Sequence, residues 1–413
     1  MASTSRSAED TQRRLALAVV AVGLVSFLVL AWWRVPWSPA GNPPPPPVSA
    51  SGVFTPEQID RAEGYAAWAR LWSWSALVVS LALGWWLALA ARSRRLFARL
   101  RGGWWLRVLQ AVVIVQAVLG LLLLPLDAAQ HEHGRRNGLT DQAWSGFLRD
   151  EVVSWLIGVV VSALLAWLVV GCARRWRSWP LAVAAAAGGL VLLGSYGYPL
   201  VVEPLFNSFH SLPAGSLRTQ VMQLADREGV RVDDVLVADA SRRTTTLNAY
   251  VSGFGDTRRV VLYDNLVRDE PPGQVLAVVA HELGHAREDD VLTGSLLGVA
   301  GAVLGVGLLT LVLGRGGRRG WPAAGEPVVV PLLMALVATA SLVAAPIENG
   351  ISRRIETRAD VISLRATHDP GAFVALQKEL AVRSLADPTP PAWSQWWFGS
   401  HPTVLQRIGL AER

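Results

Sequence analysis

Long runs of uncharged residues alternate with polar segments along the chain. Each run is close to the ~20 helical residues that cross the hydrocarbon core of a bilayer, so the pattern predicts seven transmembrane helices. They cover residues 15–33, 71–91, 108–126, 152–173, 178–202, 291–314 and 327–347. We expect an all-α membrane protein with a small α+β unit, divided into an N-terminal membrane domain, 1–202, with five of the helices and a second domain, 203–413, with the last two.

The first run has two interpretations. Arg6, Arg13 and Arg14 precede it, as basic residues precede a secretory signal peptide. However, it ends in Trp32-Trp33-Arg34, whereas signal peptidase cleaves after small residues. We therefore expect a retained membrane anchor.

The polar segments differ in kind. Residues 34–70 contain five consecutive prolines and then an amphipathic stretch, which predicts a semi-rigid spacer and a surface helix. Residues 127–151 contain His131-Glu132-His133, which we interpret as part of a solvated loop because no second cluster at metal spacing is near. The segment 203–290 is long enough to fold in water. Its patterns predict helices at 217–228 and 273–288 and strands at 235–239 and 259–263.

The composition agrees with a membrane protein. Hydrophobic residues make up 52% of the 413 residues and charged residues 17%, against about 25% in soluble proteins. The net charge of +6 comes from arginines in short clusters between apolar runs, which predicts topological anchors and no nucleic-acid partner. Cys172 is the single cysteine, which excludes an internal disulfide and a Cys-rich metal site.

The predicted helix 273–288 contains His281-Glu282-Leu283-Gly284-His285. Two histidines four residues apart share one face of a helix, so both imidazoles can reach one zinc ion, while the glutamate can activate a water molecule. The alternative is an ordinary helix with two core or surface histidines. That alternative does not explain why three polar groups interrupt an otherwise apolar helix.

A catalytic zinc site needs a third protein ligand. After the seventh run, Glu356 and Asp360 are one helical turn apart on one face. We predict that Glu356 binds the metal and that Asp360 accepts the free N–H of a ligating histidine. Glu348 is the rival ligand, at the end of the apolar run, where an interfacial charge is expected in any case.

These motifs resemble the M48 family of membrane zinc metalloproteases, and within it the seven-span CAAX prenyl protease (Ste24) type rather than the four-span HtpX type. The resemblance covers most of the chain. Beside the HELGH pattern, it rests on Ser352-Arg353 through Asp360, Asn248-Ala249-Tyr250 with Gly253, Glu203 through Asn207, and Ser400-His401-Pro402 with Arg407.

The resemblance implies a zincin-like domain and a role for each matching residue. One Zn²⁺ per chain would be held by His281, His285 and Glu356, with Glu282 as general base. Asn248, Ala249 and Tyr250 would lie on an edge strand that pairs with an extended substrate. His401 would stabilise the oxyanion unless it only caps a helix, and Arg407 would hold local structure or a substrate carboxylate.

We therefore predict a multi-pass cell-membrane zinc metalloendopeptidase that acts on membrane-associated or lipidated peptides. A broad-specificity quality-control protease of the HtpX type is the alternative, and a non-catalytic scaffold is a weaker one. The side of the membrane is open. Four segments on one face carry fourteen arginines and two short loops on the other carry six, so the positive-inside rule places the active site outside the cytoplasm. The family resemblance implies the cytosolic side.

Overall fold

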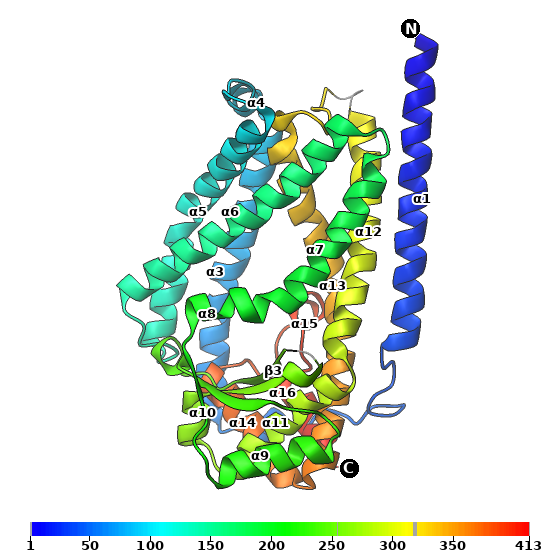
Figure 1. The fold of residues 1–413 in the computed structure, drawn as a ribbon. Helices are drawn as coiled ribbons and strands as arrows, with labels where there is room; N and C mark the ends of the chain where they lie inside the picture. Colours follow the sequence, from blue (N-terminus) through cyan, green and yellow to red (C-terminus); the bar gives the residue numbers. More distant parts are fainter. Residues whose placement is uncertain (1, 254, 317–319, 413) are drawn as a thin grey trace.

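The computed structural model describes residues 2–253, 255–316 and 320–412. A bundle of long helices forms one half of the molecule, and a small α+β domain lies at one end of it (Figure 1). In these residues, seven helices are long and apolar enough to cross a membrane. They are α1 (Ala2–Arg34), α3 (Pro56–Leu89), α5 (Trp104–Arg136), α6 (Trp144–Arg175), α7 (Trp179–Val201), α12 (Asp290–Gly316) and α13 (Val330–Thr367). The predicted fold class, a seven-helix membrane protein with a small α+β domain, is confirmed.

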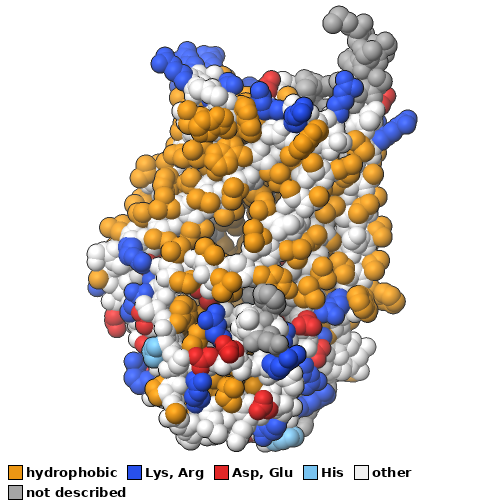
Figure 2. Space-filling model, viewed as in Figure 1, with side chains coloured by type: hydrophobic (Ala, Val, Ile, Leu, Met, Phe, Trp, Pro, Cys, Tyr) orange, Lys and Arg blue, Asp and Glu red, His pale blue; other side chains and the backbone are white. Residues whose placement is uncertain are grey.

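The surface of the bundle matches a lipid environment. Apolar side chains cover it in a broad band, basic side chains gather at the end that carries α4 (Ala91–Ala98), and charges of both signs cover the α+β domain (Figure 2). Leu121, Leu193 and Val343 lie within the long helices and are 70%, 68% and 66% exposed. Such exposure is unfavourable in water and favourable in lipid, so the chain is a multi-pass integral membrane protein.

Helix α1 packs along α12 at the edge of the bundle (Figure 1). A Cβ added to Gly23 would clash with the backbone of Leu304, and one added to Gly307 would lie 2.7 Å from Val20. Small residues that let two helix backbones approach this closely are typical of transmembrane helix pairs. The packing favours the retained anchor over the signal peptide.

Two polar segments differ from the sequence-based expectation. The amphipathic stretch before residue 71 is the first part of α3, which begins at Pro56 with a capping box on Thr55. His131-Glu132-His133 belongs to the last turns of α5 and not to a solvated loop. His133 stacks on Tyr65 and His131 on Phe147, with ring centroids 4.7 and 4.5 Å apart. Both helices are longer than the ~20 residues that cross a bilayer core, and contacts between them, such as the stacking of Tyr65 on His133, stabilise the extra turns.

The α+β domain is built on a four-stranded sheet of order β1-β2-β4-β3. Its strands are β1 (Phe209–Ser211), β2 (Asp234–Ala238), β4 (Arg259–Tyr263) and β3 (Ala249–Ser252). Strand β2 is parallel to β4, and the other two pairs are antiparallel. Strand β3 therefore forms one edge of the sheet. The predicted strands 235–239 and 259–263 are confirmed, with β2 shifted by one residue.

The remaining helices cover the sheet or connect it to the bundle. They are α2 (Ala50–Val53), α8 (Glu203–Phe206), α9 (Ser216–Arg227), α10 (Asp264–Asp269), α11 (Pro272–Arg287), α14 (Pro370–Ser384), α15 (Ala392–Phe398) and α16 (Val404–Leu410). Val221 of α9, Val260 of β4 and Val279 of α11 are fully buried in one core. The predicted helices 217–228 and 273–288 are confirmed within one residue. Arg318 and Arg319, which contribute to the arginine count, lie outside the described residues.

Candidate active site

Helix α11 carries the HELGH pattern through the centre of the α+β domain. Pro272 lies in its first turn, where the missing backbone N–H has no intrahelical partner to lose. Val275, Val279 and Leu283 are fully buried, so the apolar face of α11 fixes its rotation. His281 and His285 consequently share the opposite side, one turn apart.

Helix α13 continues from the membrane into this domain and lies directly against α11. A Cβ added to Gly284 would lie 3.2 Å from Ile362, so the glycine of the HELGH pattern permits the close helix approach. Ser363 donates a hydrogen bond to the carbonyl of Ala277 at 2.6 Å. These contacts fix the register that places Glu356 beside the two histidines.

Three ligand atoms converge between α11 and α13. The Nε2 atoms of His281 and His285 are 3.1 Å apart, and the Glu356 carboxylate lies 3.2 Å from the first and 3.6 Å from the second. The edges of a tetrahedron around zinc are about 3.3–3.4 Å for bonds of about 2.0–2.1 Å. Glu356 Oε2 is buried, and imidazole nitrogens of His281 and His401 lie 3.2 and 3.3 Å from it. The residues present therefore fit a small divalent cation.

A carboxylate orients each of the two histidines. His281 Nδ1 lies 2.9 Å from Asp360 Oδ1, and His285 Nδ1 lies 3.0 Å from Asp290 Oδ2. Each carboxylate is in turn held by an arginine, Asp360 by Arg407 and Asp290 by Arg358. A carboxylate beside Nδ1 favours the tautomer with the proton on that nitrogen, which leaves both Nε2 lone pairs directed at the same point.

The structure distinguishes the candidate metal-binding carboxylates by their distance from the two histidines. Glu348 is exposed and lies two turns from Glu356, about 12 Å along the helix axis. Glu282 also offers an oxygen within 4.8 Å of the histidine ligand atoms. Glu356 is nearer than Glu282 to both histidines, so its position suits a ligand, whereas that of Glu282 suits a neighbouring base.

The electrostatics of the cluster are those of a cation site. Burial lowers the pKa of His281, but hydrogen bonds to Asp360 and Glu356 raise it more, to about 9. Burial also raises the pKa of Glu282 above its usual range, against the opposing effect of the neighbouring histidines. A carboxyl group with a raised pKa is suited to taking up a proton near neutral pH.

His401 faces the same cluster from the segment before α16. Its Nε2 lies 3.3 Å from Glu356 Oε2, and Gln395 donates to its carbonyl oxygen at 2.7 Å. The side chain that caps α16 belongs to Thr403, which accepts from the backbone of Gln406. The helix-capping alternative for His401 is therefore wrong.

The candidate substrate-binding residues lie at and next to the sheet edge. Asn248 precedes β3, its carbonyl accepts from the Tyr263 amide at 3.1 Å, and its side chain bonds the amide of Ala249. Tyr250 donates its hydroxyl to Glu203 at 3.1 Å, which ties the edge strand to the end of the fifth transmembrane segment. Strand β3 is an edge strand and packs against α11, the helix that carries the histidines.

Sequence reasoning missed Asp290 and Arg358. Helical spacing from His285 could not indicate Asp290, because α11 ends at Arg287 and Asp290 begins the next helix. The available signal was the pair of aspartates that follows the HELGH helix. Only the turn between α11 and α12 determines which of the two reaches the histidine.

The α+β domain of this seven-helix membrane protein brings together the two HELGH histidines and a glutamate from another helix. This combination of fold and site indicates a membrane metalloprotease. The family model described as Peptidase family M48 matches residues 211–413. Over these residues the chain is similar to the M48 peptidases; it is a metalloendopeptidase, and its fold is of the Ste24 type. It acts on peptide or protein substrates.

Similar proteins come from bacteria and eukaryotes. The chain is 27% identical over 323 residues to an uncharacterized metalloprotease, YhfN, of Bacillus subtilis, covering 73% of this chain and 72% of that protein. It is 30% identical over 225 residues to a CAAX prenyl protease 1 homolog of Oryza sativa, covering 52% of this chain and 51% of the relative. The chain thus matches about half the length of that plant relative.

The fold is also that of a solved structure. The crystal structure of S. mikatae Ste24p superposes with a TM-score of 0.75 over 97% of this chain and 99% of that chain, at 18% identity. The likeness covers the bundle and the α+β domain together.

Proposed function

We propose that His281, His285 and Glu356 hold one zinc ion per chain and that the chain is a zinc metalloendopeptidase. The observation that carries the proposal is the convergence of two Nε2 atoms and one carboxylate at 3.1, 3.2 and 3.6 Å. Two nitrogens and one oxygen are a usual donor set for catalytic zinc. When bound, zinc lowers the pKa of water towards about 7 and polarises a carbonyl group.

Glu282 is the general base in this proposal. Its carboxylate neighbours both histidines without being the nearest carboxylate to them, so it can accept the proton of the attacking water. The same carboxyl group then gives the proton to the leaving amine. The raised pKa of Glu282 supports both transfers, because it reduces the difference in proton affinity between the partners.

The edge of β3 positions the substrate. An extended peptide can add to a free sheet edge through its backbone, and Asn248, Ala249 and Tyr250 lie along this edge. The hydroxyl of Tyr250 is engaged by Glu203. Recognition here is therefore assigned mainly to backbone groups.

His401 and Arg407 receive different roles. The imidazole of His401 is 56% exposed and lies beside Glu356, so it can donate to the oxyanion that forms from the substrate carbonyl. Arg407 binds both oxygens of Asp360. Of its two predicted roles, this pairing supports the local structural one.

The substrates are membrane-associated or lipidated peptides. The relatives named CAAX prenyl protease 1 and the position of the α+β domain against membrane helices support this class. We compare two peptides of one sequence, one farnesylated at cysteine and one not. The farnesylated peptide is expected to have the higher kcat/KM, and equal values would contradict this substrate class without affecting the assignment of the metal site.

The other functions receive less support. The structural likeness covers 97% of this chain, including its seven long apolar helices, which does not favour the four-span quality-control type. A scaffold without activity would not need the arrangement of Glu282 beside two oriented histidines. We also propose the division of the chain at residue 203, which the family match over residues 211–413 supports.

Asp290→Asn is expected to lower zinc affinity about 10–100-fold, because an amide orients the His285 tautomer less strongly than a carboxylate does. The matched control is Asp289→Asn. The Asp289 side chain is 53% exposed and pairs with Arg258 at 3.0 Å, whereas that of Asp290 is 8% exposed. Competition with a chromogenic chelator measures both affinities. Equal affinities in the two variants would remove Asp290 from the metal site.

We propose that the active site faces away from the cytoplasm, because the arginine-rich loops favour the opposite end for the cytoplasmic side. A reporter that is active only in the cytoplasm, fused after the last residue, is expected to give little signal. The same reporter fused after residue 177 is expected to give a strong one. The reverse pattern would place the active site in the cytosol.

A further inference from the structure

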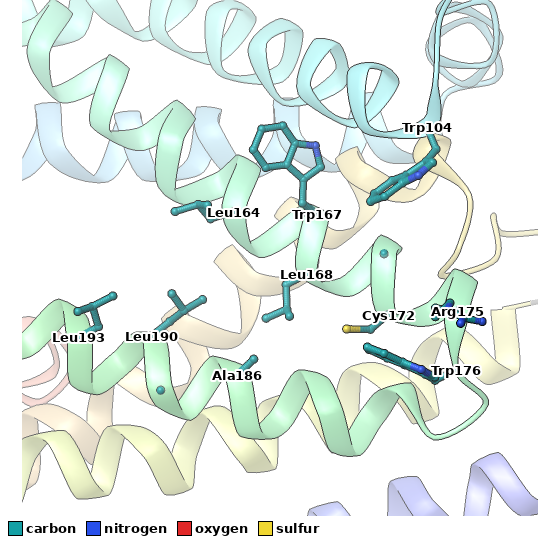
Figure 3. Close-up of a pocket in the computed structure, with 12 residues that line it drawn as sticks. Trp104, Leu164, Trp167, Leu168, Cys172, Arg175, Trp176, Ala186, Leu190 and Leu193 are labelled. Atoms are coloured by element: carbon teal, nitrogen blue, oxygen red, sulfur yellow. The ribbon is translucent and has the colours of Figure 1, made fainter.

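A groove of about 700 Å³ opens between α6 and α7, near the end of the bundle that lies away from the α+β domain. Figure 3 shows Leu164 and Leu168 of α6 opposite Leu190 and Leu193 of α7 along its length. Leu164 is 46% exposed and Leu193 is 68% exposed. Both helices cross the membrane, so this apolar groove is accessible to hydrocarbon chains.

One end of the groove is aromatic and basic. Trp176 and Arg175 line it at the turn between the two helices, and Trp104 lies on its other side (Figure 3). Tryptophan and arginine at the end of a membrane span are typical of the level of the lipid headgroups.

Two neighbouring arginines at this end, Arg174 and Arg175, differ in their contacts. Arg174 donates to the carbonyl of Gly325 at 3.1 Å and lies over the ring of Trp104, 5.8 Å from its centroid. Arg175 is exposed and has no hydrogen bond or ion pair with the side chains and backbone that the structure describes. Its forked donors are therefore available to a phosphate group next to the apolar groove.

We propose that the groove binds a phospholipid with an anionic headgroup, one acyl chain lying between α6 and α7 and the phosphate lying against Arg175. The charge complementarity argues for an anionic lipid, because basic pockets between transmembrane helices favour such headgroups. The groove ends at Leu193, midway along α7, and the HELGH helix lies in the α+β domain beyond the far end of α7 (Figure 1). The lipid in the groove therefore lies apart from the site of peptide cleavage.

Two glycines of α7 provide a matched pair of variants. Gly189 lines the groove and Gly194 does not, and a Cβ added to either one meets no atom within 4 Å. Gly189→Leu therefore places a side chain at the groove, whereas Gly194→Leu adds the same side chain at a position that does not line it. For the charge, Arg175→Gln is compared with Arg92→Gln, since Arg92 is an exposed arginine of α4 at the same end of the bundle.

The experiment titrates the full-length protein in detergent with phosphatidylglycerol or phosphatidylcholine of identical acyl chains and counts bound lipids by native mass spectrometry. The unmodified protein is expected to bind phosphatidylglycerol about fivefold more tightly, the effect of one arginine near an anionic headgroup. Arg175→Gln is expected to abolish this preference and Gly189→Leu to weaken the binding of both lipids. The two control variants should behave like the unmodified protein. Equal affinity for the two lipids, or equal losses in the paired variants, would overturn the proposal.

Discussion

Glu282→Gln is expected to lower kcat for peptide cleavage about 10²–10⁴-fold, because glutamine cannot accept the proton of the attacking water. The zinc content should remain near one ion per chain, since Glu282 is not the carboxylate nearest to the histidines. Cleavage of a fluorogenic peptide and elemental analysis of the same preparation measure the two quantities. The amide and the carboxyl group have nearly the same volume, so the packing of α11 should not change.

The control for this variant is Glu288→Gln. Glu288 lies at the end of α11 and pairs with Arg358 at 3.0 Å, outside the convergent ligand atoms. Activity close to that of the unmodified protein is expected for the control. If Glu282→Gln retained more than a few per cent of the activity, the assignment of the base would be wrong.

Glu356→Ala is expected to remove both the bound metal and the activity, because the two histidines alone form an incomplete site of low affinity. Glu348→Ala, on the same helix, should keep both. The expected contrast follows from position, since Glu356 lies 3.2 and 3.6 Å from the histidine nitrogens while Glu348 is exposed two turns away. Metal content and peptide cleavage are measured on both variants.

Thermal unfolding of the metal-free proteins serves as the folding control for this pair. Similar midpoints for Glu356→Ala and the unmodified protein would show that the loss of metal is local. Loss of metal in Glu348→Ala, with retention in Glu356→Ala, would move the third ligand to Glu348.

The membrane part of the fold could be predicted from sequence because its physical requirement is local. A helix crossing lipid must satisfy its own backbone and present apolar side chains over about 20 residues, and both conditions are visible in the sequence. The helix ends were less predictable. The extra turns of α5 depend on His131 and His133 stacking on Phe147 and Tyr65, which are distant in sequence.

The site was predictable to the extent that helix geometry determines it. The spacing of His281 and His285, and of Glu356 and Asp360, places each pair on one helix face without reference to the rest of the fold. The contact of Asp290 with His285 depends on the turn between α11 and α12, where Asp289 has a positive φ of 53°. No local pattern in the sequence determines which aspartate points at the metal ligands.

The most direct test of the central claim measures zinc and peptide cleavage together in the purified, detergent-solubilised protein. The account predicts one zinc ion per chain, loss of both zinc and cleavage on treatment with a strong chelator, and recovery of both when one equivalent of zinc is returned. Cleavage that persists in protein shown to be free of metal would contradict the account.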